Sequence, residues 1–295
     1  MNFNQVHFPD TYQVTNKEIS ILGSIQADAL ELLIDFLLSS NQVVQKSIEH
    51  KPFFYLLAKI RFNLEAVQLL MPKLTEDFRF KTSINLIYRG IVSDIINTLY
   101  LFSWCDQTVD EQPRLSTELD ILQVDFLNAV NKIVEAESEL SPEELERNKN
   151  WQQELILANL NLYDSHKGSW KKPRQIRKET GFDNDIDRSL DNPTETAKIM
   201  HIGRSMLASR SQIESCFKYL SQYQHFSPRM HEFLLSDPAY DLEVYTQVVH
   251  LMLVTLKQVS QVLNYNDPEI FKVRYEAVEE RFWKAYPPSQ VPPKK

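Results

Sequence analysis

Three polar residues of this chain, Arg89, Asp94 and His225, have side chains that suit catalysis. A guanidinium stabilises developing negative charge, and a carboxylate and an imidazole can exchange protons. Such a set would suit a hydrolase or nuclease of the helical toxin and phage-defence type. However, Arg89 and Asp94 lie about 140° apart around a helix, so they face different neighbours or flank a cavity. Because a buried charge needs a partner in any protein, the sequence favours structural ties to adjacent helices.

A second polar stretch, YLSQYQHFSPRMHE from Tyr219 to Glu232, ends one helix and begins the next through Ser227-Pro228. His225 and Ser227 are placed to bond the backbone groups left free at such a junction. We therefore expect a polar pocket between the helices over 76–104 and 193–235. Its expected binding residues are Tyr88, Tyr223 and Ser227.

Histidines 201, 225, 231 and 250 in the C-terminal part raise the question of a metal. Metal sites in helical bundles use Glu-x-x-His pairs one turn apart, and the chain has neither this spacing nor His-x-x-x-His. We expect no metal and no cofactor. His250 is interpreted as a hydrogen-bonded histidine of the core.

Six basic residues with Trp170 among them lie between Lys167 and Lys178, as in some nucleic-acid-binding segments. Acidic residues follow at once, at 183, 185 and 187, and these would repel phosphates. We therefore do not expect duplex DNA as a partner. The segment is interpreted as a solvated crossover with a short helix from Pro173 to Glu179, ended by Gly181.

The element that must position these groups is the helix around 82–104, TSINLIYRGIVSDIINTLYLFSW. It is apolar on almost every side, which predicts a helix buried among others. Most later helix starts carry a proline preceded by Ser, Asn or Asp, a typical N-cap followed by proline. The expected helices cover residues 24–46, 52–71, 76–104, 117–139, 142–163, 193–223, 228–235, 238–263 and 268–284, after an irregular arm over 1–20.

The fold class predicted is all-α, a bundle of about eight or nine helices around the helix at 76–104, without a sheet. Only five glycines occur, which argues against tight hairpins and phosphate-binding loops. We expect a single domain over 1–295, with the crossover at 164–191 separating helical sets at 21–163 and 193–284.

The net charge of −8, with 43% apolar residues, indicates a globular protein without general attraction to nucleic acid. Cys105 and Cys216 are far apart and match no metal spacing, which suits a reducing compartment. No apolar run is long enough to span a membrane, and no secretion signal is recognised. The expected location is the cytoplasm.

The chain resembles a family of bacterial all-helical domains of unknown function. The resemblance rests on Tyr88-Arg89 through Asp94 in an apolar helix and on the later Leu220-Ser221-x-Tyr223-x-His225-x-Ser227-Pro228. It covers roughly residues 50–260; that family has Glu where this chain has Asp94. The resemblance implies an all-helical fold and no activity. Helical ribonucleases carry an Arg-x(4–6)-His motif, which is absent here.

The function expected from the sequence is therefore that of a helical binding or interaction protein with a polar pocket between helices. The alternative is an enzyme, a hydrolase or nuclease using Arg89, Asp94 and His225. The two differ in whether those side chains converge on one cleft. Substrate, protein partner and oligomeric state do not follow from the sequence.

Overall fold

A computed structural model describes residues 15–44, 50–77, 80–105, 113–137, 141–182, 190, 193–224, 238–263 and 267–287. These residues are almost entirely helical, so the all-α prediction is confirmed. They form two compact units. Unit 1 comprises Met1–Ser103 and Lys198–Lys295, and unit 2 comprises Trp104–Ala197.

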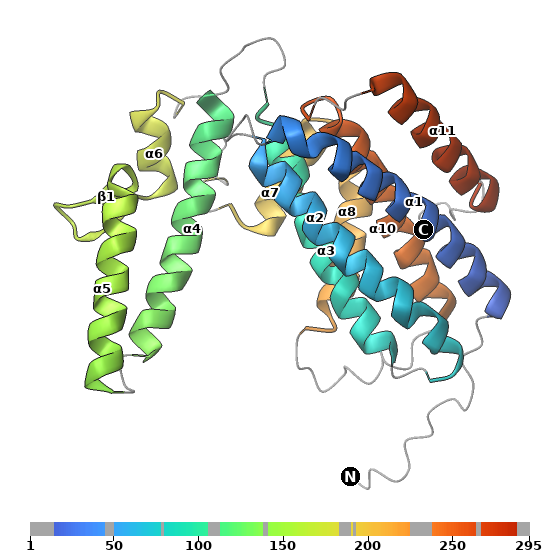
Figure 1. Ribbon diagram of the computed structural model, residues 1–295, viewed down its shortest axis with the longest axis horizontal. Helices are drawn as coiled ribbons and strands as arrows, with labels where there is room; N and C mark the ends of the chain where they lie inside the picture. Colours follow the sequence, from blue (N-terminus) through green and yellow to red (C-terminus); the bar gives the residue numbers. More distant parts are fainter. Residues whose placement is uncertain are drawn as a thin grey trace, which may run out of the picture. The chain divides into compact units, whose positions relative to one another are not determined.

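Unit 1 is a helical bundle built from both ends of the chain (Figure 1). The helix α7, Glu195–Arg204, begins in unit 2 and continues into unit 1. The other helices of unit 1 are α1 (Asn16–Val44), α2 (Lys51–Leu70), the 3-10 helix η2 (Met71–Thr75), α3 (Phe80–Phe102), α8 (Arg210–Ser221), α10 (Pro238–Val259) and α11 (Pro268–Ala285).

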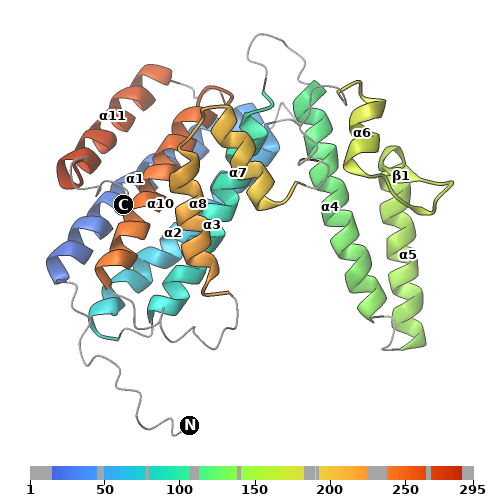
Figure 2. The ribbon, with the colours of Figure 1, turned by 180° about the vertical axis from the view of Figure 1, so that it is seen from behind.

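Helix α3 is the centre of unit 1, as the apolar sequence over 82–104 predicts. It contacts α2 on one side (Figure 1) and α8 on the other (Figure 2), and it also packs against α10. Apolar side chains such as Ile84, Ile91 and Ile95 are fully buried in it. Helix α1 covers α2 and α10, and α11 packs on α1 and α10. The prediction of a buried central helix is confirmed.

The first helix begins earlier than expected. The predicted irregular arm over 1–20 is wrong from Asn16 onward, because α1 starts there. Thr15 caps it: the Glu18 amide donates to Thr15 Oγ1, and Thr15 N and Oγ1 both donate to Glu18 Oε2. This reciprocal arrangement is a capping box, whose Thr-x-x-Glu spacing is visible in the sequence.

The predicted single helix over 193–223 is also wrong, because α7 and α8 are separate helices. The break includes Met206 at φ 54°, and Ser209 caps α8 by accepting from the Gln212 amide. A Cβ at Gly203 would lie 2.7 Å from Arg210 Cβ, so only glycine allows this close approach of the two helices. The local Ser209 cap overrides helical periodicity.

Unit 2 contains a pair of helices followed by a small hairpin and a short helix. Its elements are α4 (Pro113–Glu137), α5 (Pro142–Ala158), the 3-10 helix η3 (Leu160–Leu162), β1 (Tyr163–Asp164), β2 (Ser169–Trp170) and α6 (Pro173–Glu179). The expected short helix at Pro173–Glu179 is confirmed, and Gly181 follows it at φ 84°.

The prediction of no sheet is wrong in detail. Strands β1 and β2 pair antiparallel, with Tyr163 opposite Trp170. In the turn, Asp164 Oδ1 accepts from the His166 and Lys167 amides, and Gly168 takes φ 63°. Strands of two residues are too short to show an alternation of apolar and polar residues. The sequence therefore signalled this hairpin only through the turn residues Asp164 and Gly168.

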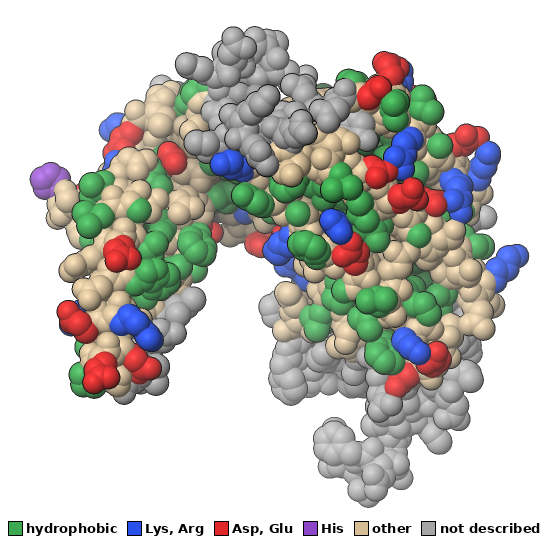
Figure 3. Space-filling view, in the orientation of Figure 1, with side chains coloured by type: hydrophobic (Ala, Val, Ile, Leu, Met, Phe, Trp, Pro, Cys, Tyr) green, Lys and Arg blue, Asp and Glu red, His purple; other side chains and the backbone are tan. Residues whose placement is uncertain are grey.

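Unit 2 has its own small core and a buried ion pair. The core comprises Ile121, Val124, Leu127, Leu162, Trp170 and Ile176. Arg177 Nε and Nη2 donate to the two carboxylate oxygens of Glu118 at 2.7 and 2.9 Å, and Nη1 donates to the Leu190 carbonyl at 2.8 Å. Hydrophobic side chains also reach the surface of unit 2 (Figure 3). Phe126 of α4 and Trp151 of α5 are among the exposed ones. The segment predicted as a solvated crossover thus supplies core residues.

The unit boundaries differ from the predicted organisation. The predicted division at 164–191 lies inside unit 2, and unit 1 joins residues from the two helical sets expected at 21–163 and 193–284. The single-domain interpretation stays a prediction.

Candidate functional site

Arg89 ties α3 to α8. Its Nε donates to Ser221 Oγ at 2.8 Å, and its guanidinium carbon lies 3.9 Å from the centroid of the Phe217 ring. Ser221 Oγ in turn donates to the Phe217 carbonyl at 2.6 Å. Arg89 is only 8% exposed, so this hydroxyl and ring stabilise a largely buried cation.

Asp94 faces a different helix. Its Oδ1 lies 2.8 Å from Lys59 Nζ on α2, and the Asp94 side chain is 3% exposed. Burial raises the pKa of the Asp94 carboxyl, opposed by the hydrogen bond and the charge of Lys59. Arg89 and Asp94 therefore contact α8 and α2 respectively, as their angular separation predicts. His225 and Ser227 lie outside the described residues, so their place relative to Arg89 stays a prediction.

A buried polar centre joins α3, α8 and α10, and it consists of Lys81, Tyr219, Tyr223 and Asp241. Asp241 Oδ2 lies 2.6 Å from Lys81 Nζ, and Oδ1 accepts from Tyr219 Oη at 2.6 Å and from Tyr223 Oη at 3.4 Å. The Lys81 and Asp241 side chains are 2% and 0% exposed. Burial raises the pKa of Asp241, opposed by Lys81 and then Tyr219. Three side chains thus donate to the Asp241 carboxylate.

Asn85 lies on α3 one turn after Lys81 and one turn before Arg89. It is fully buried, and neither its Nδ2 nor its Oδ1 has a hydrogen-bond partner among the described residues. Its amide nevertheless lies beside Asp241 and lowers the pKa of that carboxyl as a hydrogen-bond donor does, in a contact that falls outside ordinary hydrogen-bond geometry. Because this contact is weak, most of the free-energy cost of burying the Asn85 amide is not compensated.

The predicted binding residues Tyr88 and Tyr223 are both used inside the protein. Tyr88 Oη donates to Gln26 Oε1 at 2.8 Å, and its ring stacks on Tyr245 with centroids 4.5 Å apart. Burial, followed by the charge of Tyr286, raises the pKa of the Tyr88 phenol. Tyr223 belongs to the polar centre and is 4% exposed. Neither phenol group is open to a ligand at a surface.

Sequence reasoning found Tyr223 but missed Lys81, Tyr219 and Asp241. Asp241 occupies the first turn of α10, where an acid is favoured by the helix dipole alone, so its position gave no sign of burial. Lys81 lies in the first turn of α3, and from the sequence a lysine at the start of a helix is expected to be exposed. One charge in each of two apolar helices indicates that a buried ion pair forms, but it does not identify the two residues that form it.

A cavity of unit 1 lies between α1, α8, α10 and α11, and we call it the aromatic pocket. Its volume is about 410 Å³, which is in the range of small-molecule sites. Phe282, Trp283 and Tyr286 of α11 and its C-terminal cap form one wall. The other lining residues are Glu18, Ile21, Gln212, Leu242, Glu243, Thr246, Gln247, His250, Ala285 and Pro287. The lining is predominantly apolar with a few polar groups.

His250 is fixed in this pocket by an amide and by rings. Its ring stacks on Phe282 with centroids 5.3 Å apart and meets Trp283 edge-on at 5.0 Å. Gln212 Nε2 lies 3.2 Å from His250 Nδ1 and also donates to the Gln247 carbonyl at 3.4 Å. Because the carbonyl requires a donor, the amide nitrogen must face both groups, and Nδ1 must accept.

The tautomer of His250 follows from that geometry. If Nδ1 accepts, the proton of the neutral ring lies on Nε2, and a second proton on Nδ1 would face the Gln212 amide hydrogens. Burial lowers the pKa of His250, opposed by the charge of Glu279. The imidazole is therefore neutral at pH 7 and presents an Nε2–H donor. The expectation of a hydrogen-bonded histidine is confirmed, though His250 is half-buried.

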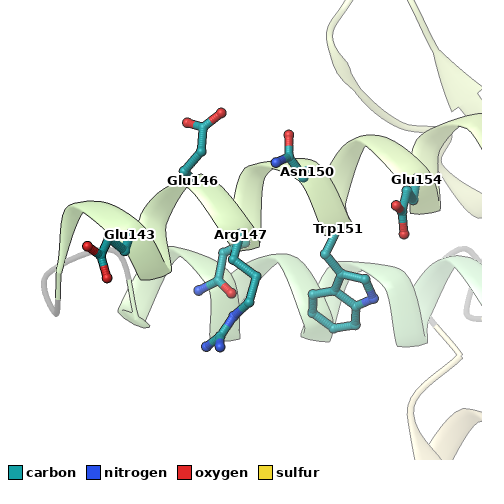
Figure 4. A pocket seen from close by; sticks show the side chains of 7 residues that line it. Glu143, Glu146, Arg147, Asn150, Trp151 and Glu154 are labelled. Atoms are coloured by element: carbon teal, nitrogen blue, oxygen red, sulfur yellow. The ribbon is translucent and has the colours of Figure 1, made fainter.

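Two other cavities are less suited to bind a ligand. One lies on α5, where Arg147 and Trp151 project from one side of the helix and Glu146 from the other (Figure 4). All of its lining residues belong to that single helix, so it has no opposing wall. The other lies between the N-terminal part of α1 and η2 and reaches Gln26, whose amide already bonds Tyr88 and the Leu64 carbonyl.

Within the described ranges, no three His, Cys, Asp or Glu side chains are arranged to hold a metal ion. Among the helices described, none has the length and apolar character needed to cross a membrane. Comparisons with protein families, with curated proteins and with solved structures find no match to this chain. The resemblance to bacterial all-helical domains stays a prediction.

Proposed function

We propose that this chain is a binding protein whose ligand is a small molecule with an apolar ring, held in the aromatic pocket. The observation that carries the proposal is a cavity of ligand size, walled by three aromatic rings, with a neutral imidazole fixed at its side. Sites of this kind are mostly apolar and use a few placed polar groups to orient the ligand. The Nε2–H of His250 is the donor that such a ligand would meet.

This proposal keeps the binding function expected from the sequence but moves its site. The expected pocket lay between α3 and the 193–235 region, where the described polar groups are buried and bonded to one another. The enzymatic alternative receives no support from Arg89 and Asp94, because each contacts a different helix. We place the binding function in the cytoplasm, consistent with Cys105 and Cys216 forming no disulfide with each other.

Isothermal titration with naphthalene-1-methanol, a neutral two-ring probe, tests the proposal. At about 12 non-hydrogen atoms, ordinary ligand efficiencies give a Kd of roughly 10 µM to 1 mM. Tyr286→Ala removes one of the three rings of the aromatic wall, at the C-terminal cap of α11, and should weaken binding about tenfold because one aromatic contact is lost. Trp151→Ala, which removes an exposed aromatic side chain of unit 2, is the matched control and should leave the Kd unchanged. Absence of saturable binding, or equal weakening by both substitutions, would refute the pocket as the site.

A further inference from the structure

We propose that the ligand of the aromatic pocket carries a positively charged amino group on its apolar body. This inference rests on the proposed function and assigns the chemical class of the ligand. The class follows from the charges around the pocket, from the aromatic side chains that line it, and from the proton position that the Gln212 amide favours on His250.

The charged side chains that line the pocket are both acidic. Glu18 of α1 and Glu243 of α10 are exposed lining residues, and the described lining includes neither lysine nor arginine. The negative charge of Glu18 acts on Tyr286, and that of Glu279 acts on His250. An anionic ligand would therefore meet repulsion from several carboxylates, whereas a cation would be attracted.

Four cations on α8 and α11 already have carboxylate partners. On α11, Arg281 pairs with Asp28 and Lys284 pairs with Glu280. On α8, Arg210 and Lys218 both pair with Glu214. The lining itself contains no lysine or arginine, and Glu18 and Glu243 accept hydrogen bonds there from the neutral donors Thr15 and Gln247, so a ligand ammonium can add an ion pair with either carboxylate.

The histidine does not supply that charge. Protonation of His250 Nδ1 would set its N–H against the Gln212 amide, which also donates to the Gln247 carbonyl. The imidazole thus acts as a neutral donor and does not repel a cation. It can orient a hydroxyl or ether oxygen on the same ligand.

The aromatic wall suits a cation as well as an apolar ring. Phe282 packs edge-on against Trp283, with centroids 5.0 Å apart, and lies 5.5 Å from Tyr286. Tryptophan and tyrosine faces attract ammonium groups, most strongly where water is excluded. An aryl or alkyl amine would place its body against these rings and its ammonium group toward Glu243 or Glu18.

Three naphthalene compounds with one ring system and different charges test this class directly. These are 1-naphthylmethylammonium, neutral naphthalene-1-methanol and anionic 1-naphthoate, titrated against the full chain at low and high salt. We expect the ammonium compound to bind roughly tenfold tighter than the alcohol, and the carboxylate more weakly than either. The preference should shrink in 0.5 M salt, because the rim carboxylates are exposed.

Glu243→Gln should reduce the ammonium-to-alcohol preference about threefold while leaving alcohol binding unchanged. Glu214→Gln, an acid of α8 outside the lining, is the matched control and should leave the preference intact. Equal affinity for ammonium and alcohol, or tightest binding of the carboxylate, would overturn the assignment of ligand class and leave the proposed function standing. Failure of all three compounds to bind would instead refute the proposed function.

Discussion

The buried pair of Lys81 and Asp241 provides a stringent test of the fold around α3. Both side chains are essentially inaccessible, and the Nζ–Oδ2 distance is 2.6 Å. Substituting Lys81 by Met keeps the side-chain length but leaves a carboxylate without its cation. Removing one partner of a buried pair typically destabilises a protein by about 3–5 kcal/mol. We expect a loss near the lower end, about 3 kcal/mol, because Tyr219 and Tyr223 still donate to Asp241.

The double substitution Lys81→Met with Asp241→Asn should recover most of that loss, because no isolated charge remains and Tyr219 can still donate to the new amide oxygen. We expect it to lie within about 1 kcal/mol of the parent, so the two single losses should be strongly non-additive. Lys284→Met is the matched control, since Lys284 and Glu280 form an exposed pair. Its expected cost is below about 0.5 kcal/mol.

The Lys81→Met protein should also respond to pH in a defined direction. Without the ammonium, burial raises the pKa of Asp241 and is opposed only by the weaker effects of Tyr219 and Asn85, so the folded state binds a proton that the unfolded state releases. Stability should therefore rise as pH falls from neutral toward the ordinary carboxyl range. Urea unfolding at several pH values, with unchanged denaturant slope, measures this. A loss below about 1 kcal/mol at pH 7, or stability that falls on mild acidification, would refute the buried pair.

Three further predictions concern single residues. Arg177→Met should destabilise unit 2 by about 3–5 kcal/mol, because it leaves the Glu118 carboxylate buried without its bidentate partner. Urea unfolding followed at Trp170 measures this loss, and a loss under about 1 kcal/mol would contradict the buried pair. Asn85→Leu should stabilise unit 1 by up to about 1 kcal/mol, because a buried amide without a hydrogen bond of ordinary geometry is replaced by an apolar group of similar size. Clear destabilisation in the same assay would show that the amide donates to Asp241. The pKa of His250, measured by 15N NMR, should lie below the usual histidine pKa of 6.5, and the neutral ring should carry its proton on Nε2. The contribution of His250 to stability should therefore be lost as pH falls below about 6.5. A raised pKa would contradict the Gln212 geometry.

Helix positions were largely predictable because their signals are local. Ser141 accepts from the Glu144 amide and Asp267 from the Ile270 amide, and in each case proline follows the cap, as the sequence indicated. Helix α10 begins at Pro238, also as predicted. The capping box at Thr15 carried the same kind of signal and could have placed the start of α1 correctly.

The sites were not predictable because their contacts are distant in sequence. Lys81 and Asp241 come from different helices with 159 residues between them, and nothing in either helix indicates the other. The aromatic pocket likewise combines Glu18 with Tyr286, from opposite ends of the chain. Arg89 and Asp94 drew attention because charges in an apolar helix are conspicuous, but conspicuous charges are often structural ties. The aromatic residues of α11 follow the spacing of an ordinary amphipathic helix, so the sequence did not mark them as the wall of a pocket.

The central claim is that the aromatic pocket of unit 1 binds a small molecule with an apolar ring, and Trp283 offers the most direct measurement. The chain has four tryptophans, of which Trp283 lies in unit 1 and lines the pocket, whereas Trp104, Trp151 and Trp170 lie in unit 2. In a 5-fluorotryptophan-labelled protein titrated with naphthalene-1-methanol, we predict that the 19F resonance of Trp283 shifts saturably while the other three stay in place. An unmoved Trp283 resonance, or equal shifts of all four, would contradict the account.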